Sequence, residues 1–137
     1  MKKKLYRIGK EADRTGSKRD PSPLHVYKAV VESVVDGDTL LVRIDLGFNV
    51  WVAQRIRFRG INCAEMSDGG EAAKTYVAEQ LKDIPFIVIK TYKTDMYGRY
   101  VADVFYSPTL KDKEAVAEDG IFLNQEILKA GLAKMML

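Results

Sequence analysis

Three consecutive segments near the start of the chain alternate between apolar and polar side chains, and short turn signals separate them. The segments cover residues 25–31, 39–44 and 50–60. Asp36-Gly37 lies between the first two, and Gly47-Phe48-Asn49 lies between the second and third. Alternation with a period of two is typical of half-buried strands, and Asp-Gly between such segments is a strong hairpin signal. The pattern therefore predicts an antiparallel meander of three strands.

A helix and two further strands are expected in the second half of the chain. Apolar residues at helical spacing predict a helix over residues 71–84, and Asp68 with Glu71 resembles a capping box at its start. Strand patterns follow at residues 86–89 and 100–106. The chain thus adds a helix and two strands to the meander.

Two stretches show no periodicity, and one short helix is expected near the end. Residues 62–70 and 107–120 are predicted as loops, whereas residues 123–130 have a helical pattern that Gly131 ends. Three strands, a helix, two strands and a helix fit a small five-stranded barrel of the OB type. The competing interpretation is an α+β arrangement, in which a meander and a separate hairpin pack on two helices.

Composition limits the classes of protein and of metal site. The chain has 137 residues, enough for one domain that buries a core without a disulfide or metal. Cys63 and His25 are the only residues of their types, which excludes an internal disulfide and makes a structural zinc site a poor fit. Any metal should use oxygen ligands, as calcium and magnesium do. No apolar run approaches the roughly 18 residues of a membrane helix, so no membrane contact is expected.

The positive charge of the chain is concentrated at its start. Residues 1–20 carry a net charge of +5 and the rest carry −2. We interpret residues 1–23 as a basic tail or linker, solvated or attracted to a polyanion, and residues 24–137 as the folded domain. No apolar segment of a secretory signal follows the first lysines, so we expect a cytoplasmic protein unless a signal preceded residue 1 in the native chain.

Four clusters contain the residue types that chemistry would need. They are residues 35–39, 57–65, 95–99 and 124–132. Taken singly, these clusters are typical of a hairpin turn, a strand with solvent-facing arginines, a second turn, and a helix with its cap. The order of the four clusters is more specific than any one of them.

Together the clusters resemble the staphylococcal nuclease (thermonuclease) family. The motifs are Asp-Gly-Asp-Thr, Arg-x-x-Gly-Ile-x-x-x-Glu after a strand, Asp-x-Tyr-Gly-Arg, and a short helix ending in Ala-Gly-Leu-Ala. The resemblance runs from about Tyr27 to Met135. It implies a β-barrel with helices, of the OB type with five strands, in agreement with the periodicity.

The resemblance also implies a calcium site. Asp38 corresponds to a carboxylate ligand, and Asp36 to an outer carboxylate that orients the water molecules of the metal. Asn62 stands where the family usually has a second aspartate ligand, and the backbone carbonyl of Cys63 corresponds to a further ligand. An amide oxygen still binds calcium, but one negative charge is lost, so we expect weaker binding.

The remaining carried-over residues concern the phosphodiester. By resemblance, Arg57 and Arg99 contact the phosphate, Glu65 is the general base, and Tyr97 lies beside the nucleotide. A guanidinium matches phosphate geometry with paired donors, and a carboxylate that accepts a proton from water contributes roughly 10²–10⁴ in rate. A hard dication polarises a phosphoryl oxygen and positions water.

Further departures from the family suggest a weaker grip on the substrate. Ala64 stands where a proline usually stiffens the loop before Glu65, and Met96 stands where a lysine that contacts the nucleotide is common. Family members commonly continue into another helix beyond the position of Leu137.

The leading hypothesis is a monomeric, calcium-dependent nuclease that cleaves DNA and RNA. The alternative is a catalytically weak or inactive nuclease-like domain that binds nucleic acid or protein. Tyr27, Phe48 and Trp51 could stack on bases, but we expect them in the barrel core, where such residues are found more often.

Overall fold

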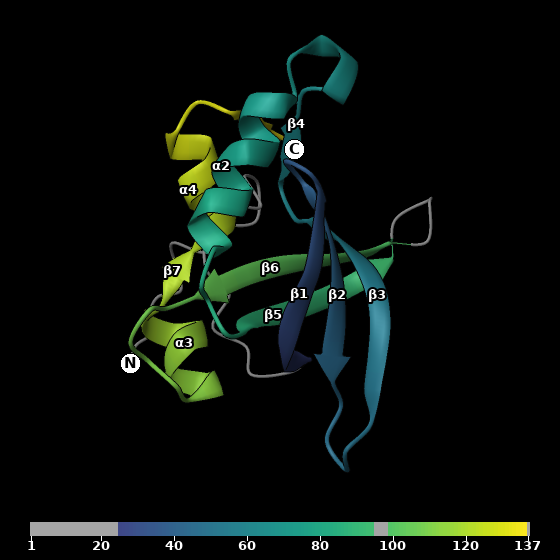
Figure 1. Ribbon diagram of the computed structural model, residues 1–137, viewed down its shortest axis with the longest axis vertical. Helices are drawn as coiled ribbons and strands as arrows, with labels where there is room; N and C mark the ends of the chain where they lie inside the picture. The colour runs from purple at the N-terminus through teal and green to yellow at the C-terminus, as the bar shows by residue number, and fades with distance from the viewer. Residues whose placement is uncertain (1–24, 95–98, 137) are drawn as a thin grey trace.

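The computed structural model describes residues 25–94 and 99–136, drawn in colour in Figure 1. The predicted basic tail and Tyr97 therefore lie outside the described residues. In chain order the elements are β1 (Val26–Asp36), β2 (Thr39–Asp45), β3 (Trp51–Phe58), β4 (Ile61–Cys63), the 3-10 helix η1 (Met66–Asp68), α2 (Glu71–Leu81), β5 (Ile87–Thr94), β6 (Tyr100–Tyr106), α3 (Lys113–Asp119), β7 (Ile121–Phe122), α4 (Leu123–Lys129) and β8 (Ala133–Met135).

Five strands close into a barrel. β1, β2 and β3 form the predicted antiparallel meander, β1 also pairs with β5, and β5 pairs with β6. Parallel pairing between β3 and β6, as in Ile56 opposite Tyr100, closes the ring. β7 adds a short strand beside β6. The closure confirms the OB-type barrel and excludes the open α+β alternative.

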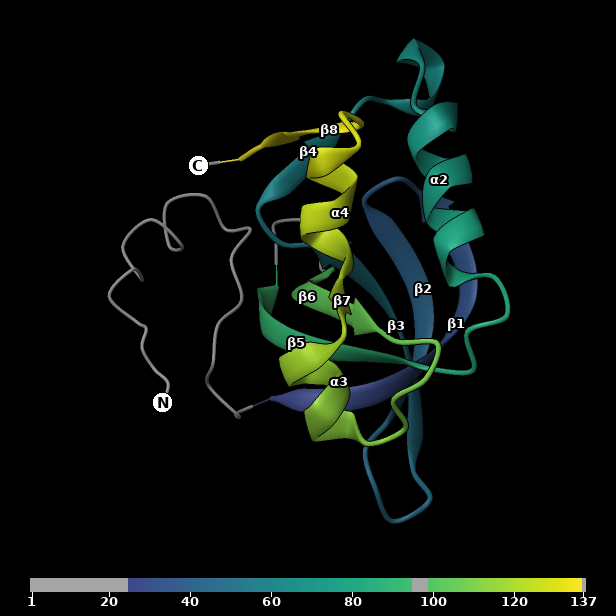
Figure 2. The same ribbon diagram turned by 90° about the vertical axis from the view of Figure 1, so that its left-hand side faces the viewer.

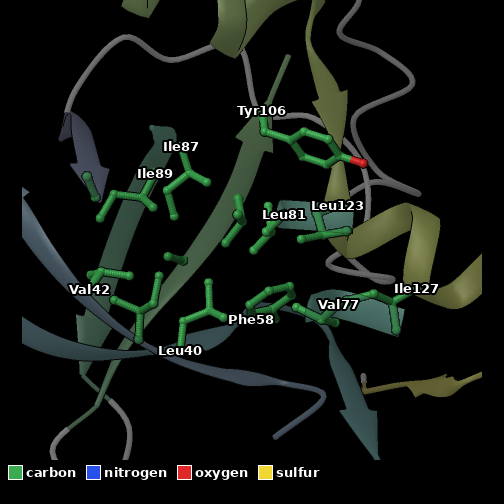
Figure 3. Packing of buried hydrophobic residues seen from close by; sticks show 14 of the residues in the cluster. Leu40, Val42, Phe58, Val77, Leu81, Ile87, Ile89, Tyr106, Leu123 and Ile127 are labelled. Carbon is green, nitrogen blue, oxygen red and sulfur yellow. The ribbon is translucent and has the colours of Figure 1, made fainter. Parts of the chain in front are cut away.

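The core lies inside the barrel and continues beneath two helices. One face of each strand points inward because side chains alternate along a strand. Figure 3 shows residues of β2, β3, β5 and β6 meeting residues of α2 and α4. The labelled residues of this cluster are Leu40, Val42, Phe58, Val77, Leu81, Ile87, Ile89, Tyr106, Leu123 and Ile127.

The start of α2 differs from the prediction. The N-cap is Gly70, and no side chain caps the helix, so the capping box of Asp68 and Glu71 is wrong. A Cβ at Gly70 would lie 2.4 Å from the carbonyl oxygen of Ala64, which explains a glycine at this position. The helix ends at Leu81, three residues before the predicted end.

The loop predicted over residues 107–120 contains a helix, which corrects that prediction. α3 begins after Asp112, whose carboxylate accepts a hydrogen bond from the Ala115 amide at 3.3 Å. Val116 is buried in a small second cluster with Phe105 and Phe122, whose rings stack at 5.0 Å. A seven-residue helix with one buried residue gives too weak a periodicity to detect.

The core placement expected for two aromatic residues is wrong. Phe48 is fully exposed and Trp51 is 43% exposed, whereas Tyr27 packs against the core as expected. Figure 1 shows the reason: the β2–β3 hairpin runs past the end of the barrel, so its tip lies away from the core.

The last strand of the chain pairs with a strand from the middle of the chain. β8 pairs antiparallel with β4, and the Met136 amide donates to the carbonyl of Gly60 at 2.9 Å. In Figure 2, α4 leads directly into this pair. The pairing holds β4, which lay in a predicted loop, in a fixed position. Across residues 25–94 and 99–136, no helix is long and apolar enough to span a membrane.

Candidate functional site

Four separate segments bring five of the predicted site residues close together. Asp36 and Asp38 come from the β1–β2 turn, and Arg57 comes from the end of β3. Asn62 lies on β4, and Arg99 directly precedes β6. These segments are brought together by the β2–β3 pairing and the parallel closure of β3 with β6.

The carboxylate of Asp38 lies at the centre of this arrangement and is nearly buried. Its Oδ2 accepts a hydrogen bond from the Cys63 amide at 2.9 Å and lies 3.4 Å from Nη2 of Arg57. Its Oδ1 accepts from the Thr39 hydroxyl at 3.2 Å. Both oxygens are thus satisfied by groups from three segments, as a buried carboxylate requires.

Arg57 is buried. The strand pattern taken alone had predicted a solvent-facing arginine at this position. Its Nη1 donates to the carbonyls of Phe58 and Ile61 at 3.1 and 2.9 Å. Its Nη2 donates to Oδ1 of Asn62 at 2.7 Å and is ion-paired with Asp38. The guanidinium is therefore held in one orientation before any ligand binds.

Asp36 completes a pair of carboxylates in the turn. Its Oδ1 accepts a hydrogen bond from the Asp38 amide at 3.1 Å. Burial, followed by interaction with the Asp38 side chain, raises the pKa of Asp36. The two neighbouring carboxylates form a place where a bound cation would relieve their mutual repulsion.

Gly37 keeps this turn close to the rest of the site. A Cβ at this position would lie 2.4 Å from Cβ of Ala73 on α2 and 2.9 Å from Sγ of Cys63. The Asp-Gly signal thus predicted the turn correctly, but the glycine is required here by a close approach of α2 and β4. Gly37 does not have a positive φ, so its backbone conformation does not by itself require a glycine.

Arg99 contacts the residue that follows the turn. Its Nη1 donates to the hydroxyl of Thr39 at 3.2 Å, and Thr39 is the β2 partner of Arg57. The structure therefore brings both predicted phosphate arginines to the same turn. Thr39 was missed as the residue that links them, although its position directly after Asp38 was a usable signal.

Glu65 is not joined to this cluster. It is exposed at the start of η1, where its backbone carbonyl accepts from the amides of Asp68 and Gly70. Among the described residues its carboxylate makes no hydrogen bond or ion pair. Ala64 and Glu65 directly follow β4, and the side chain of Glu65 is exposed to solvent.

The Cys63 thiol is unsuited to act as a nucleophile. Burial, with the negative charges of Asp38 and Asp36, raises its pKa to about 12. The thiol therefore stays protonated near neutral pH, as expected for a cysteine without a histidine partner. The contribution of Cys63 to the site is its backbone.

The metal-binding capacity of the site is limited to oxygen atoms. In the part of the chain that the structure describes, no three His, Cys, Asp or Glu side chains gather as a metal group. Two carboxylates, of Asp36 and Asp38, and the amide oxygen of Asn62 are present instead, and Asn62 is bound to Arg57. Hard oxygens of this kind suit calcium, with few charges and hence weakly.

An ion pair between Arg59 and the buried Asp103 lies next to the site residues of β3. Nε and Nη2 of Arg59 donate to the Asp103 carboxylate at 2.9 and 3.1 Å, and the Tyr92 hydroxyl donates to it at 3.2 Å. Burial raises the pKa of Asp103, which is fully enclosed, while Arg59 and Tyr92 act in the opposite direction. This network fixes the end of β3 against β5 and β6, and sequence reasoning did not find it.

The fourth cluster, residues 124–132, has a structural role. Taken alone, its pattern predicted a helix with its cap, and α4 lies there. The buried amide of Asn124 accepts from the Val104 amide at 2.9 Å and donates to the carbonyls of Arg59 and Ala102. These bonds attach α4 to β6 and to the segment after β3.

Comparison with known protein families agrees with this geometry. The sequence model of staphylococcal nuclease homologues matches residues 55–137, more than half of the chain. The chain belongs to the staphylococcal nuclease homologue family. The match begins within β3 and so contains Arg57, Glu65 and Arg99 of this nuclease-family domain. Asp36 and Asp38 precede the matched segment. A search of curated proteins gave no match.

Proposed function

We propose that this domain hydrolyses phosphodiester bonds of DNA and RNA with the help of calcium. One observation carries the proposal: Arg57 at the end of β3 and Arg99 directly before β6 both reach the turn that holds Asp36 and Asp38 or the residue next to it, Thr39. Two guanidinium groups beside a pair of carboxylates provide donors for a phosphate and oxygen ligands for a cation at one place.

Calcium would be held by oxygen atoms of the β1–β2 turn and β4. The donors are the carboxylate of Asp38, the amide oxygen of Asn62 and the carbonyl of Cys63, with Asp36 in the outer shell. When bound, calcium would polarise a phosphoryl oxygen. With one carboxylate in direct contact, the affinity should be low until a substrate phosphate adds its charge.

The two arginines would bind the phosphate and stabilise its developing charge. Arg57 is held by two backbone carbonyls and by Asn62, so little reorganisation is needed when the phosphate arrives. Arg99 is anchored through Thr39 on the other side. Glu65 would accept the proton of the attacking water, and Tyr97 would lie beside the nucleotide.

One observation favours the alternative function of a binding domain. Arg57 is ion-paired directly with Asp38, so a guanidinium already neutralises the carboxylate that calcium would need. Asn62 adds no second charge. A domain with this arrangement could bind nucleic acid or protein and cleave slowly or not at all.

The test is digestion of single-stranded DNA and RNA with calcium and with a chelator. We expect cleavage in the presence of calcium and none in the chelator. Glu65→Gln should lower the cleavage rate by roughly 10²–10⁴. Glu118→Gln is the matched control, since Glu118 is an exposed carboxylate on α3. Full activity of Glu65→Gln, or cleavage in the chelator, would contradict the mechanism. Binding without cleavage at any calcium concentration would establish the alternative.

A further inference from the structure

The outward face of the β2–β3 hairpin runs without interruption from the candidate site to the far end of the barrel. The register has no bulge, so cross-strand partners share this face in regular order. At the site end Thr39 faces Arg57, and at the tip Asp45 faces Trp51. Between them Leu41 faces Arg55 and Arg43 faces Ala53. Figure 1 shows the hairpin extending past the other strands.

Three arginines and one aspartate, Asp45, lie on this face. Arg55 is exposed, and its side chain makes no ion pair or hydrogen bond with residues 25–94 or 99–136. Arg43 is ion-paired with Glu32 at 2.6 Å and lies over the Trp51 ring at 5.3 Å. Arg57, which is buried and ion-paired with Asp38, lies at the site end of the same face. The face therefore holds three arginines, whereas residues 21–137 together carry a net charge of −2.

The tip of the hairpin presents apolar and aromatic side chains to solvent. Phe48 is completely exposed, and Trp51 is 43% exposed. Leu46 and Val50 beside them are 44% and 47% exposed. None of these four side chains belongs to either buried cluster. Their presence at the tip is therefore not explained by folding of the barrel.

The backbone of the tip supports the same conclusion. Phe48 and Asn49 have φ values of 55° and 63°, and the Val50 amide donates to the Gly47 carbonyl at 2.9 Å across them. This left-handed conformation suits glycine and asparagine but is unfavourable for phenylalanine. A bulky aromatic residue that is both strained and unburied is typical of a position with a binding role.

We propose that the outward face of this hairpin binds the continuation of a single-stranded DNA or RNA chain beyond the candidate site. Arg55 and Arg43 would contact phosphates, and Trp51 and Phe48 would stack on bases. We call these four residues the hairpin track. The proposal rests on the proposed function for its class of ligand, and it adds a second contact region to that function.

The dimensions of the track suit several nucleotides. Arg57 and Trp51 are six residues apart on one strand, which corresponds to about 20 Å. A charged groove combined with aromatic stacking is the means by which proteins bind single strands without base specificity. On this face the arginines lie between the candidate site and the tip, and the aromatic side chains lie at the tip. This combination favours a single strand over a lipid surface or an apolar protein partner, since neither of these requires evenly spaced arginines.

Trp51 is the only tryptophan of the chain, so its fluorescence reports on the track directly. The full chain is titrated in a chelator with an oligothymidylate of about ten nucleotides, while the anisotropy of a dye on the strand reports binding. We expect quenching of Trp51 that saturates together with the anisotropy. A dinucleotide that occupies only the candidate site should leave Trp51 unchanged.

Two variants separate stacking from charge. Trp51→Ala should weaken binding of the longer strand about 5- to 100-fold and leave dinucleotide binding unchanged. Arg55→Gln should lower the slope of log affinity against log salt by about 0.7. Lys82→Gln removes the same charge from the exposed end of α2 and should leave the slope unchanged. Urea unfolding confirms that each variant is folded.

The possible failures are distinguishable. Binding of the longer strand with unchanged Trp51 fluorescence and normal affinity of Trp51→Ala would overturn the hairpin track and leave the proposed function standing. A blue shift of Trp51 with phosphatidylserine vesicles, but no response to nucleic acid, would overturn it in favour of a membrane surface. Absence of both nucleic-acid binding and cleavage would overturn the track and the proposed function together.

Discussion

Asn62 is the residue at which this chain departs most from the chemistry expected of a calcium site. Its amide oxygen is engaged by Arg57, and Arg57 also contacts Asp38. A carboxylate at position 62 would accept from Arg57 as the amide does and would add a charge beside Asp38. The three side chains therefore form one electrostatic unit.

We predict that Asn62→Asp tightens calcium binding by on the order of tenfold and raises the cleavage rate at limiting calcium. At saturating calcium the gain should shrink, because occupancy is then complete in both proteins. Calorimetric titration and cleavage rates across a calcium series provide the measurement. Unchanged calcium affinity would show that position 62 does not face the metal.

The two phosphate arginines should respond differently to removal. Arg57→Ala deprives Asp38 of its ion pair and two buried carbonyls of their donor, so we expect a loss of about 3 kcal/mol of unfolding free energy. Arg99→Ala should cost less stability, since Arg99 is only half-buried. Both should lower the cleavage rate by about 10²–10³.

Urea unfolding and single-turnover cleavage on the same preparations separate these effects. Arg55→Ala, which removes an exposed arginine from the same strand, is the control for stability. Near-normal cleavage by folded Arg99→Ala would remove that residue from the mechanism.

At the scale of elements, the site depends on the close packing of α2 against the β1–β2 turn. Gly37 lies against Ala73 and Cys63 with no room for a methyl group. We predict that Gly37→Ala lowers the unfolding free energy by about 1–3 kcal/mol, because the turn or the helix must move. Calcium binding should weaken as well, since Asp36 and Asp38 flank the displaced residue.

Gly47→Ala is an informative comparison for this effect. Nothing lies within 4 Å of a Cβ at Gly47, whose φ is +84°, so its substitution introduces backbone strain without a clash. Thermal unfolding of both variants, with calcium titration, provides the measurement. Weakened calcium binding in Gly47→Ala but not in Gly37→Ala would refute the role of the packed turn.

For the whole molecule, the distribution of charge sets the long-range attraction to a polyanion. Residues 1–20 carry +5, against −2 for the rest of the chain. We predict that deletion of residues 1–23 weakens binding of nucleic acid at low salt by about tenfold and flattens its salt dependence. The cleavage rate of bound substrate should not change, because the site residues lie in the folded domain.

Binding measured across a salt series, together with single-turnover cleavage, tests this prediction. A chain with residues 1–23 retained and their lysines and arginines replaced by glutamine distinguishes charge from length. Equal affinity of the deleted and full chains at low salt would show that the first 23 residues act only as a linker.

Local patterns in the sequence predicted the strands of the barrel and the order of the site motifs. Alternation and turn residues are local properties, so the meander of residues 25–60 and the strand of residues 100–106 could be predicted from short windows. The motifs around Asp38, Arg57 and Arg99, together with the short helix of residues 124–132, indicated a nuclease-like family because all four occur in order. The family match confirmed this inference.

Which side chains are buried depends on the folded arrangement. Arg55 and Arg57 have the same place in the alternation, yet Arg57 is enclosed because β4 and the β1–β2 turn pack over it, whereas Arg55 is exposed among the residues that the structure describes. Phe48 and Trp51 are exposed for the converse reason, since the hairpin extends past the barrel. Burial depends on which distant segment arrives at a face, and no local pattern encodes that arrival.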